Sequence, residues 1–144
     1  MTHPVPLPEV SDAAAPRFPV SIKGVLFLDG KSVLLRNERD EWELPGGKLE
    51  PGEAPRDRLQ VEIEEELALP VHVGPILDCW LYPVRTGVEV LIVTYLCLPA
   101  DTTCEPSLSN EHRELALFKP GQIEALAMPD GYKASIARAR LMLR

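Results

Sequence analysis

The 144-residue sequence contains few cysteines and no long run of apolar side chains. The three cysteines are an odd number without metal-ligand spacing, which argues against a disulfide framework and favours a reducing compartment. The longest apolar stretch, Val88 to Pro99, includes Glu89 and is too short to cross a bilayer. The first residues lack the basic and apolar segments of a signal peptide. We therefore expect a cytoplasmic protein that does not associate with a membrane.

Positive charge is also scarce. The sequence has 15 Lys and Arg residues and 22 Asp and Glu residues, which gives a formal net charge of -7. Non-specific binding to a nucleic acid polymer needs a basic surface, so this balance argues against that partner. It does not argue against a small phosphate-bearing substrate, because metal ions can lie between an acidic protein and an anion. The length and the 45% hydrophobic content are those of one globular domain.

The sequence predicts strands on both sides of one central helix. Residues 1–17 are rich in Pro and Ala and predict a flexible arm, so we expect a single domain over residues 18–144. Extended segments are expected at residues 20–28, 32–36, 41–45, 71–84, 88–98 and within 111–118. Helices are expected at residues 54–69 and about 131–143, with another short helix before the last one. This order predicts an α/β or α+β fold, a mixed sheet with helices packed on it.

The central helix carries an unusual concentration of carboxylates. Glu62, Glu65 and Glu66 have i, i+3 and i+4 spacing, so they share one helical face within about one turn. A neighbouring apolar stripe that can pack on the sheet consists of Leu59, Ile63 and Leu67. Like charges this close repel one another, and a hard divalent cation such as Mg²⁺ or Mn²⁺ would remove that repulsion. The alternative is an acidic helix face that is simply solvated.

The loop before the helix favours the metal-binding interpretation. Gly46 and Gly47 allow the backbone to approach a ligand closely, and Glu53 follows just before the helix, whose N-terminus suits anionic oxygens. A Gly-Gly pair alone would only indicate a turn. Combined with the acidic helix at a fixed distance, it indicates a binding site.

The combined segment resembles the Nudix box, G-x5-E-x7-R-E-U-x-E-E-x-G-U, where U is a bulky aliphatic residue. The positions in register are Gly47, Glu53, Glu62, Ile63, Glu65, Glu66 and Leu69. The strand order from about residue 18 to the C-terminus also fits the family. The resemblance implies an α/β/α sandwich with a mixed β-sheet, in which the box forms a loop–helix–loop unit.

The resemblance also implies which groups form the site. Glu62, Glu65 and Glu66 would be the main metal ligands and catalytic groups, together with the backbone carbonyl of Gly46. Gly47 and Glu53 would support the site. The metal would bridge two phosphates and lower the pKa of the attacking water.

The remaining candidate groups are assigned less directly. Family members often take a general base or a further ligand from a distant loop, and Glu111 best matches that place, with Glu114 as the alternative. Arg36 and Lys48 flank the proposed site and could bind phosphate oxygens, although a solvated surface cation explains each equally well. Trp42, Trp80 and Tyr82 could stack on a base, but packing in the sheet is the commoner role.

Two box positions depart from the pattern, with Val61 in place of Arg and Ala68 in place of Gly. Ala68 is a good helix former, so we expect little cost and a slightly longer helix. In the family the Arg is thought to hold the first Glu, here Glu53. Arg58 lies one turn earlier on the same side and could partly replace it. We therefore expect reduced but retained activity, and a gain in turnover from Val61→Arg.

The sequence as a whole predicts a metal-dependent hydrolase that cuts a pyrophosphate bond in a nucleoside diphosphate linked to another group. A nucleoside triphosphate, a nucleotide sugar or a dinucleoside polyphosphate would qualify. One alternative is a catalytically weakened Nudix-fold module that only binds nucleotides, and another is an interaction domain whose helix is acidic by coincidence. The expected partner is a small nucleotide-type molecule, and the sheet edges make a homodimer conceivable.

Overall fold

The computed structural model of the protein describes residues 15–101, 104–107 and 114–144. Within these residues, seven strands form one sheet, and two α-helices and one 3-10 turn accompany it. The strands are β1 (Val20–Leu28), β2 (Lys31–Arg36), β3 (Trp42–Glu43), β4 (Gly46–Lys48), β5 (Val71–Arg85), β6 (Val88–Pro99) and β7 (Glu114–Phe118). The helices are α1 (Pro55–Leu67) and α2 (Asp130–Met142), and the 3-10 turn is Pro120–Gln122.

The sheet is mixed, as the sequence predicted. Its main order is β3-β2-β1-β6-β5, and β1 runs parallel to β6 whereas the other pairs are antiparallel. The Asp29-Gly30 turn joins β1 to β2, and both of its residues have positive φ, as a tight two-residue hairpin requires. Strand β4 pairs with β1 and β7 pairs with β2. Because β4 carries the glycine pair, this pairing attaches the box loop to the centre of the sheet.

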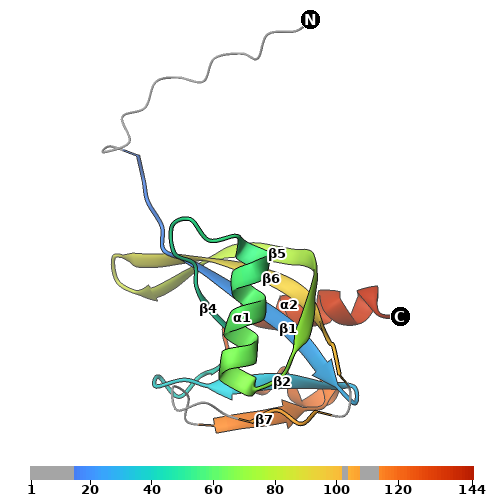
Figure 1. Ribbon diagram of the computed structural model, residues 1–144. Coiled ribbons are helices and arrows are strands. Elements are labelled where there is room, and N and C mark those ends of the chain that lie inside the picture. Colours follow the sequence, from blue (N-terminus) through green and yellow to red (C-terminus); the bar gives the residue numbers. More distant parts are fainter. Residues whose placement is uncertain (1–14, 102–103, 108–113) are drawn as a thin grey trace, which may run out of the picture.

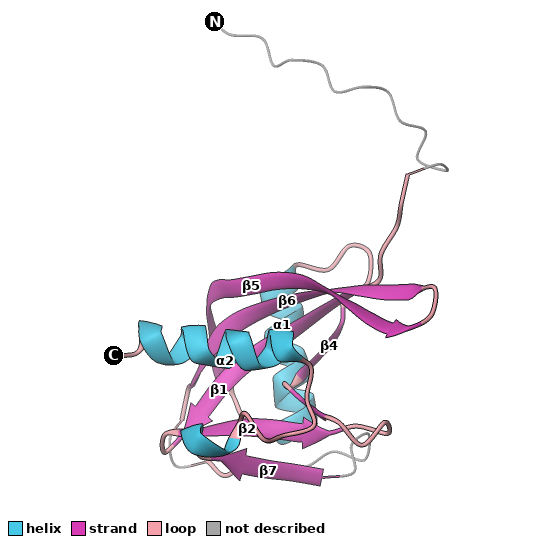
Figure 2. Ribbon diagram, turned by 180° about the vertical axis from the view of Figure 1, so that it is seen from behind, coloured by secondary structure: helices cyan, strands magenta, loops and turns pink. Residues whose placement is uncertain are grey.

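The two helices cover opposite faces of the sheet, so the expected α/β/α layering is confirmed (Figures 1 and 2). The core under α1 includes Ile22, Leu59, Ile63, Leu67 and Cys97. The core under α2 includes Val25, Leu34, Ile92, Tyr132 and Ile136. Strand alternation explains the division, because successive residues of β1 point to opposite faces.

The central helix is shorter than the sequence predicted. It ends at Leu67, and Ala68 takes a left-handed conformation with φ 51° and ψ 36°. The expectation of a longer helix was therefore wrong, because Leu69 is fully buried and Pro70 disfavours helical backbone in the residue before it. The chain must turn at Ala68 although alanine is poorly suited to that conformation. The short helix expected before α2 is only the 3-10 turn.

Two sequence predictions lie wholly or largely outside the described residues, namely the N-terminal arm and the site role of Glu111. The structure therefore says nothing about either one. Among the described residues, no helix is both long enough and apolar enough to cross a membrane.

Candidate active site

Gly46 fixes the position of the box loop on the sheet. Its φ is +141°, and a Cβ at this position would lie 2.0 Å from the backbone oxygen of Ile22, so only glycine fits. The Gly46 amide donates a 2.8 Å hydrogen bond to Oε1 of Glu66. Glu66 is only 3% exposed. The loop and the helix are thus joined by a buried contact between two residues that the sequence assigned to the same site.

Gly47 gives space to a second box carboxylate. A Cβ on Gly47 would lie 2.7 Å from Cδ of Glu62 and within 2.9 Å of both carboxylate oxygens. The Glu62 side chain therefore rests against the loop backbone at a place where any other residue would displace it. The Gly-Gly pair thus makes two close approaches, one to β1 and one to the acidic helix.

Arg58 connects the loop to the helix from the side. Its guanidinium donates a hydrogen bond to Oε1 of Glu62, and its Nε lies 3.4 Å from Oε2 of Glu53. Oε1 of Glu53 accepts a 2.7 Å hydrogen bond from the Glu50 amide. The hydrogen bond to Glu62 raises the pKa of Arg58, and the nearby carboxylates of Glu62, Glu53 and Glu65 add to this effect against partial desolvation. Val61, at the box Arg position, is 41% exposed.

The donor chemistry of the acidic helix fits a divalent cation, although its carboxylates do not converge. Glu62 is held by Arg58, Glu66 by the Gly46 amide, and Glu65 is exposed. Accordingly, no group of three acidic, His or Cys side chains in the described part of the chain is gathered closely enough to hold a metal ion. The oxygens of one helical turn beside a glycine-lined loop are nevertheless ligands that Mg²⁺ or Mn²⁺ prefers. These residues would fit the ion once their side chains turned toward it.

The remaining candidates are placed less favourably. Arg36 lies 3.5 Å from Glu114 and 3.7 Å from Asp40, so it is paired with the residue considered as the alternative base. Lys48 is exposed at the end of β4. Trp42 packs edge-on against Phe118, and Trp80 stacks on Tyr82 with the ring centroids 5.7 Å apart. These aromatic rings belong to the packing over the α2 face.

Lys23 is a charged residue near the box that the sequence reasoning missed. It is 7% exposed, and its Nζ lies 3.9 Å from Oε1 of Glu43. Burial would lower its pKa, but Tyr132, Glu43, Glu66 and Glu62 together raise it, so the ammonium stays charged. A lysine in the middle of an apolar strand is rarely buried unless it is paired, and that was the available signal.

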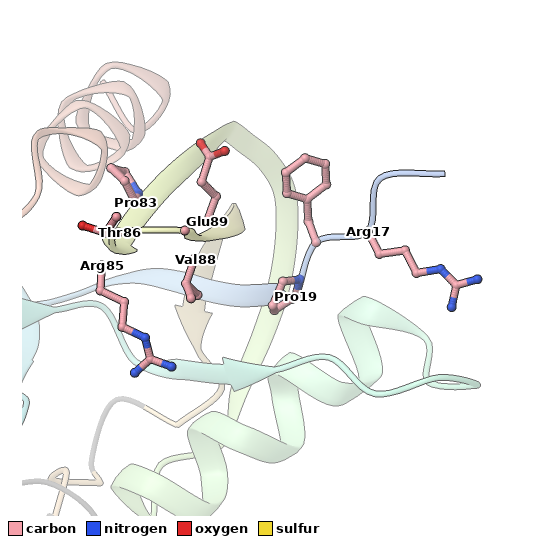
Figure 3. Close-up of a pocket in the computed structure, with 9 residues that line it drawn as sticks. Arg17, Pro19, Pro83, Arg85, Thr86, Val88 and Glu89 are labelled. Carbon is pink, nitrogen blue, oxygen red and sulfur yellow. The ribbon is translucent and has the colours of Figure 1, made fainter. Parts of the chain in front are cut away.

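A separate pocket lies at the tip of the β5–β6 hairpin (Figure 3). Its lining includes Arg17, Phe18, Arg85 and Glu89, and the close-up shows Arg17 and Arg85 at opposite ends of the pocket. All four of these residues are exposed. None of the predicted site residues lines this pocket. A shallow pocket beside Glu53, Arg58 and Val61 lies nearer to the predicted chemistry.

The fold and the loop–helix unit together define an α/β/α sandwich with an acidic helix fixed to a glycine-paired loop. Residues 18–139 match the NUDIX domain family. The chain therefore belongs to the Nudix family, and the predicted enzyme class, a Nudix pyrophosphohydrolase, is confirmed. No curated protein sequence matches the chain.

Solved structures with the same fold share little sequence with this chain. A Nudix hydrolase from Nitrosomonas europaea is 19% identical, with a TM-score of 0.73 over 89% of this chain and 92% of that one. The ORF135 protein of E. coli is 23% identical, with a TM-score of 0.66 over 89% and 91%. A UDP-X diphosphatase is 19% identical, with a TM-score of 0.73 over 91% of this chain but 66% of its own length. About a third of that enzyme therefore has no counterpart here.

Proposed function

We propose that this hydrolase uses Mg²⁺ or Mn²⁺ to cleave the pyrophosphate bond of a nucleoside diphosphate linked to another group. The observation that carries the proposal is the pair of contacts between the loop and the helix. Glu66, which is buried, accepts a hydrogen bond from the Gly46 amide, and the Glu62 carboxylate packs against Gly47. Elements 20 residues apart in sequence thus bring the box positions together. A solvated acidic helix would not require such contacts.

Glu62, Glu65, Glu66 and the Gly46 carbonyl would hold the metal, which when bound would neutralise phosphate charge and activate water. Glu66 and Gly46 would keep the helix at a fixed distance from the loop. Glu53 would support the loop through Glu50 and Arg58. Lys48, exposed at the loop, would meet an outer phosphate oxygen, and a similar role for Arg36 would require it to leave Glu114. Glu111 is the proposed general base.

The substrate class is proposed from related proteins as well as from the site. One structural neighbour is a UDP-X diphosphatase, and another, from Streptococcus suis, is an ADP-ribose pyrophosphatase that is 18% identical to this chain. Both act on a nucleoside diphosphate linked to a further group, which is the class that we propose here. A small-molecule substrate, a cytoplasmic location and a homodimer stay predictions.

A nucleotide panel with Mg²⁺ or Mn²⁺ tests the proposal. Wild type is compared with Glu65→Gln and Glu66→Gln, and Glu64→Gln is the matched control, because Glu64 is exposed on the same helix at a variable box position. Loss of one metal ligand should lower turnover by about 100-fold or more, whereas the control should stay near wild type. The Gln side chain at position 66 can still accept from Gly46, so the loop should keep its place.

The panel also separates the alternatives. Hydrolysis that is insensitive to both ligand substitutions would refute the site assignment. Tight binding of a nucleotide without hydrolysis of any substrate would instead favour a module that has kept the fold and lost catalysis.

A further inference from the structure

Arg58 lies between a carboxylate of the loop and a carboxylate of the helix, and this position has a consequence for metal binding. We propose that Arg58 is an internal cation of the acidic site: it holds Glu62 in the metal-free protein and releases it when a divalent metal binds, while its contact with Glu53 keeps the loop attached. The proposal rests on the proposed function, since it concerns the same metal. Arg58 is a positioning residue in this scheme and does not touch the substrate.

The contacts define what must move. One nitrogen of the guanidinium donates to Oε1 of Glu62, and another lies 3.4 Å from Oε2 of Glu53. Oε1 of Glu62 therefore already has a cationic hydrogen-bond donor, the Arg58 guanidinium. The carboxylate is also confined on its other side, because Gly47 leaves it just enough room. A metal that binds Glu62 through Oε1 has to displace the guanidinium.

The charges explain why such a cation is needed. Glu62, Glu65 and Glu66 place three negative charges within about one helical turn, and without a metal they repel one another. Arg58 offsets part of that repulsion from the preceding turn. The box Arg position, adjacent to Glu62, is occupied by Val61 and offers no charge.

The pair can also be displaced. The Arg58 and Glu62 side chains are 29% and 13% exposed, and they have the i, i+4 spacing of a helix-surface ion pair. Such partly exposed pairs contribute little to stability, so a divalent cation with several oxygen ligands can replace the arginine. The separate contact with Glu53 allows the guanidinium to remain near the loop after it leaves Glu62.

The test is a double-mutant cycle on Mn²⁺ binding, measured by calorimetry without nucleotide. The proteins are wild type, Arg58→Gln, Glu62→Gln and the double variant. The matched control is Arg56→Gln on the same helix, since the Arg56 guanidinium bonds to the backbone oxygens of Val73 and Gly74 instead of a carboxylate. Thermal melts confirm that each variant is folded.

We expect Arg58→Gln to bind Mn²⁺ about two- to fivefold more tightly than wild type, the effect of removing one partly exposed competing charge. The gain should disappear in the Glu62→Gln background, because the competition acts through Glu62. Arg56→Gln should leave the affinity unchanged. Turnover of Arg58→Gln should nevertheless fall, because Glu53 loses its cation.

Unchanged or weaker Mn²⁺ binding by Arg58→Gln would overturn the proposal. An equal gain in Mn²⁺ affinity when Arg58→Gln is made in the Glu62→Gln background would also overturn it. Such a gain would come from the long-range repulsion between Arg58 and the metal and not from competition for Glu62. Absence of Mn²⁺ binding by wild type would overturn it as well. These outcomes are distinguishable from failure of the proposed function, which is measured separately as nucleotide hydrolysis by wild type and its loss in Glu65→Gln.

Discussion

The two helices of the sandwich differ in how well their sequences suit a helix. Helix α2 has a basic residue in its last turn, where the helix dipole favours it, and two of its arginines bond to backbone oxygens of the sheet and its turn: Arg138 to Leu77 and Arg140 to Gly30. Neither helix has a side-chain cap at its start, but α1 also has no basic residue in its last turn. It also ends on an alanine in left-handed conformation.

This difference concerns the helix that carries the proposed metal ligands. The polar face of α1 gathers like charges, which weakens an isolated helix. Its position depends instead on the stripe of Leu59, Ile63 and Leu67, each 0% exposed. Most of the stability of α1 must therefore come from tertiary packing, which leaves its outer face available for chemistry.

The largest expected effect comes from breaking that packing. Ile63→Ala under α1 and Ile136→Ala under α2 should each lower the free energy of unfolding by about 2–5 kcal/mol, because both side chains are buried. Only Ile63→Ala should also weaken Mn²⁺ binding, since Ile63 lies next to Glu62 on the helix that carries the proposed ligands. Denaturant unfolding and calorimetry measure the two quantities. If both variants weakened Mn²⁺ binding equally, the metal site would not depend on the α1 side of the sheet more than on the α2 side, and the prediction would be wrong.

The second prediction uses a buried protonated group on each face. Burial raises the pKa of Cys97 on the α1 face to about 12, against the opposing charge of Arg56. Burial likewise raises the pKa of Tyr132 on the α2 face to about 12, against the charge of Lys23. The folded protein therefore holds more protons than the unfolded chain between about pH 9 and 12, and its stability must fall as the pH rises through this range.

Each group should contribute a loss on the order of 2–3 kcal/mol across that window. Cys97→Ala and Tyr132→Phe should each make the free energy of unfolding less dependent on pH between 9 and 12. The measurement is denaturant unfolding at several pH values, and the quantity compared is the slope, which separates proton linkage from the cavity that each substitution leaves. Cys79→Ala, at an exposed cysteine, is the control. A wild-type slope in Cys97→Ala would contradict the assignment.

The sequence predicted six of the seven described strands because their signals are local, but it missed β4 (Gly46–Lys48) because a Gly-Gly pair indicates a turn. The apolar segment Val20–Leu28 and the following Asp-Gly turn determine a strand and a hairpin without help from the rest of the chain. The end of α1 was misjudged because alanine gives no stop signal. The helix ends there because Leu69 enters the core and Pro70 follows it.

The site was only partly predictable from the sequence for a similar reason. Spacing alone placed Glu62, Glu65 and Glu66 on one helical face. It also placed Arg58 one turn before Val61 on the same side of the helix, but only the fold shows that the guanidinium contacts Glu53 and Glu62 together. Lys23 escaped notice because its partners come from other elements, Glu43 from β3 and Tyr132 from α2. Pairings of this kind depend on tertiary structure.

The third prediction tests the strained end of α1. Ala68→Gly should raise the free energy of unfolding by about 1 kcal/mol, because glycine adopts the left-handed conformation without the penalty that alanine has there. The corresponding change on the other helix, Ala137→Gly at an exposed position inside α2, should lower stability by about 1 kcal/mol. Thermal unfolding compares the two variants. A loss of stability in both would show that the conformation of Ala68 stores no strain.

The smallest expected effect concerns the missing box arginine. Val61→Arg was expected from the sequence to raise turnover, but Arg58 already contacts Glu53, so the gain in the wild-type background should be below about threefold, less than 1 kcal/mol. In the Arg58→Gln background the same substitution should restore most of the lost turnover, because it returns a cation to the position from which family members brace the loop. Steady-state kinetics on the best substrate of the panel decide the matter, and Val61→Gln in the same background controls for side-chain size. Failure of Val61→Arg to rescue Arg58→Gln would show that Arg58 does more than replace the box arginine.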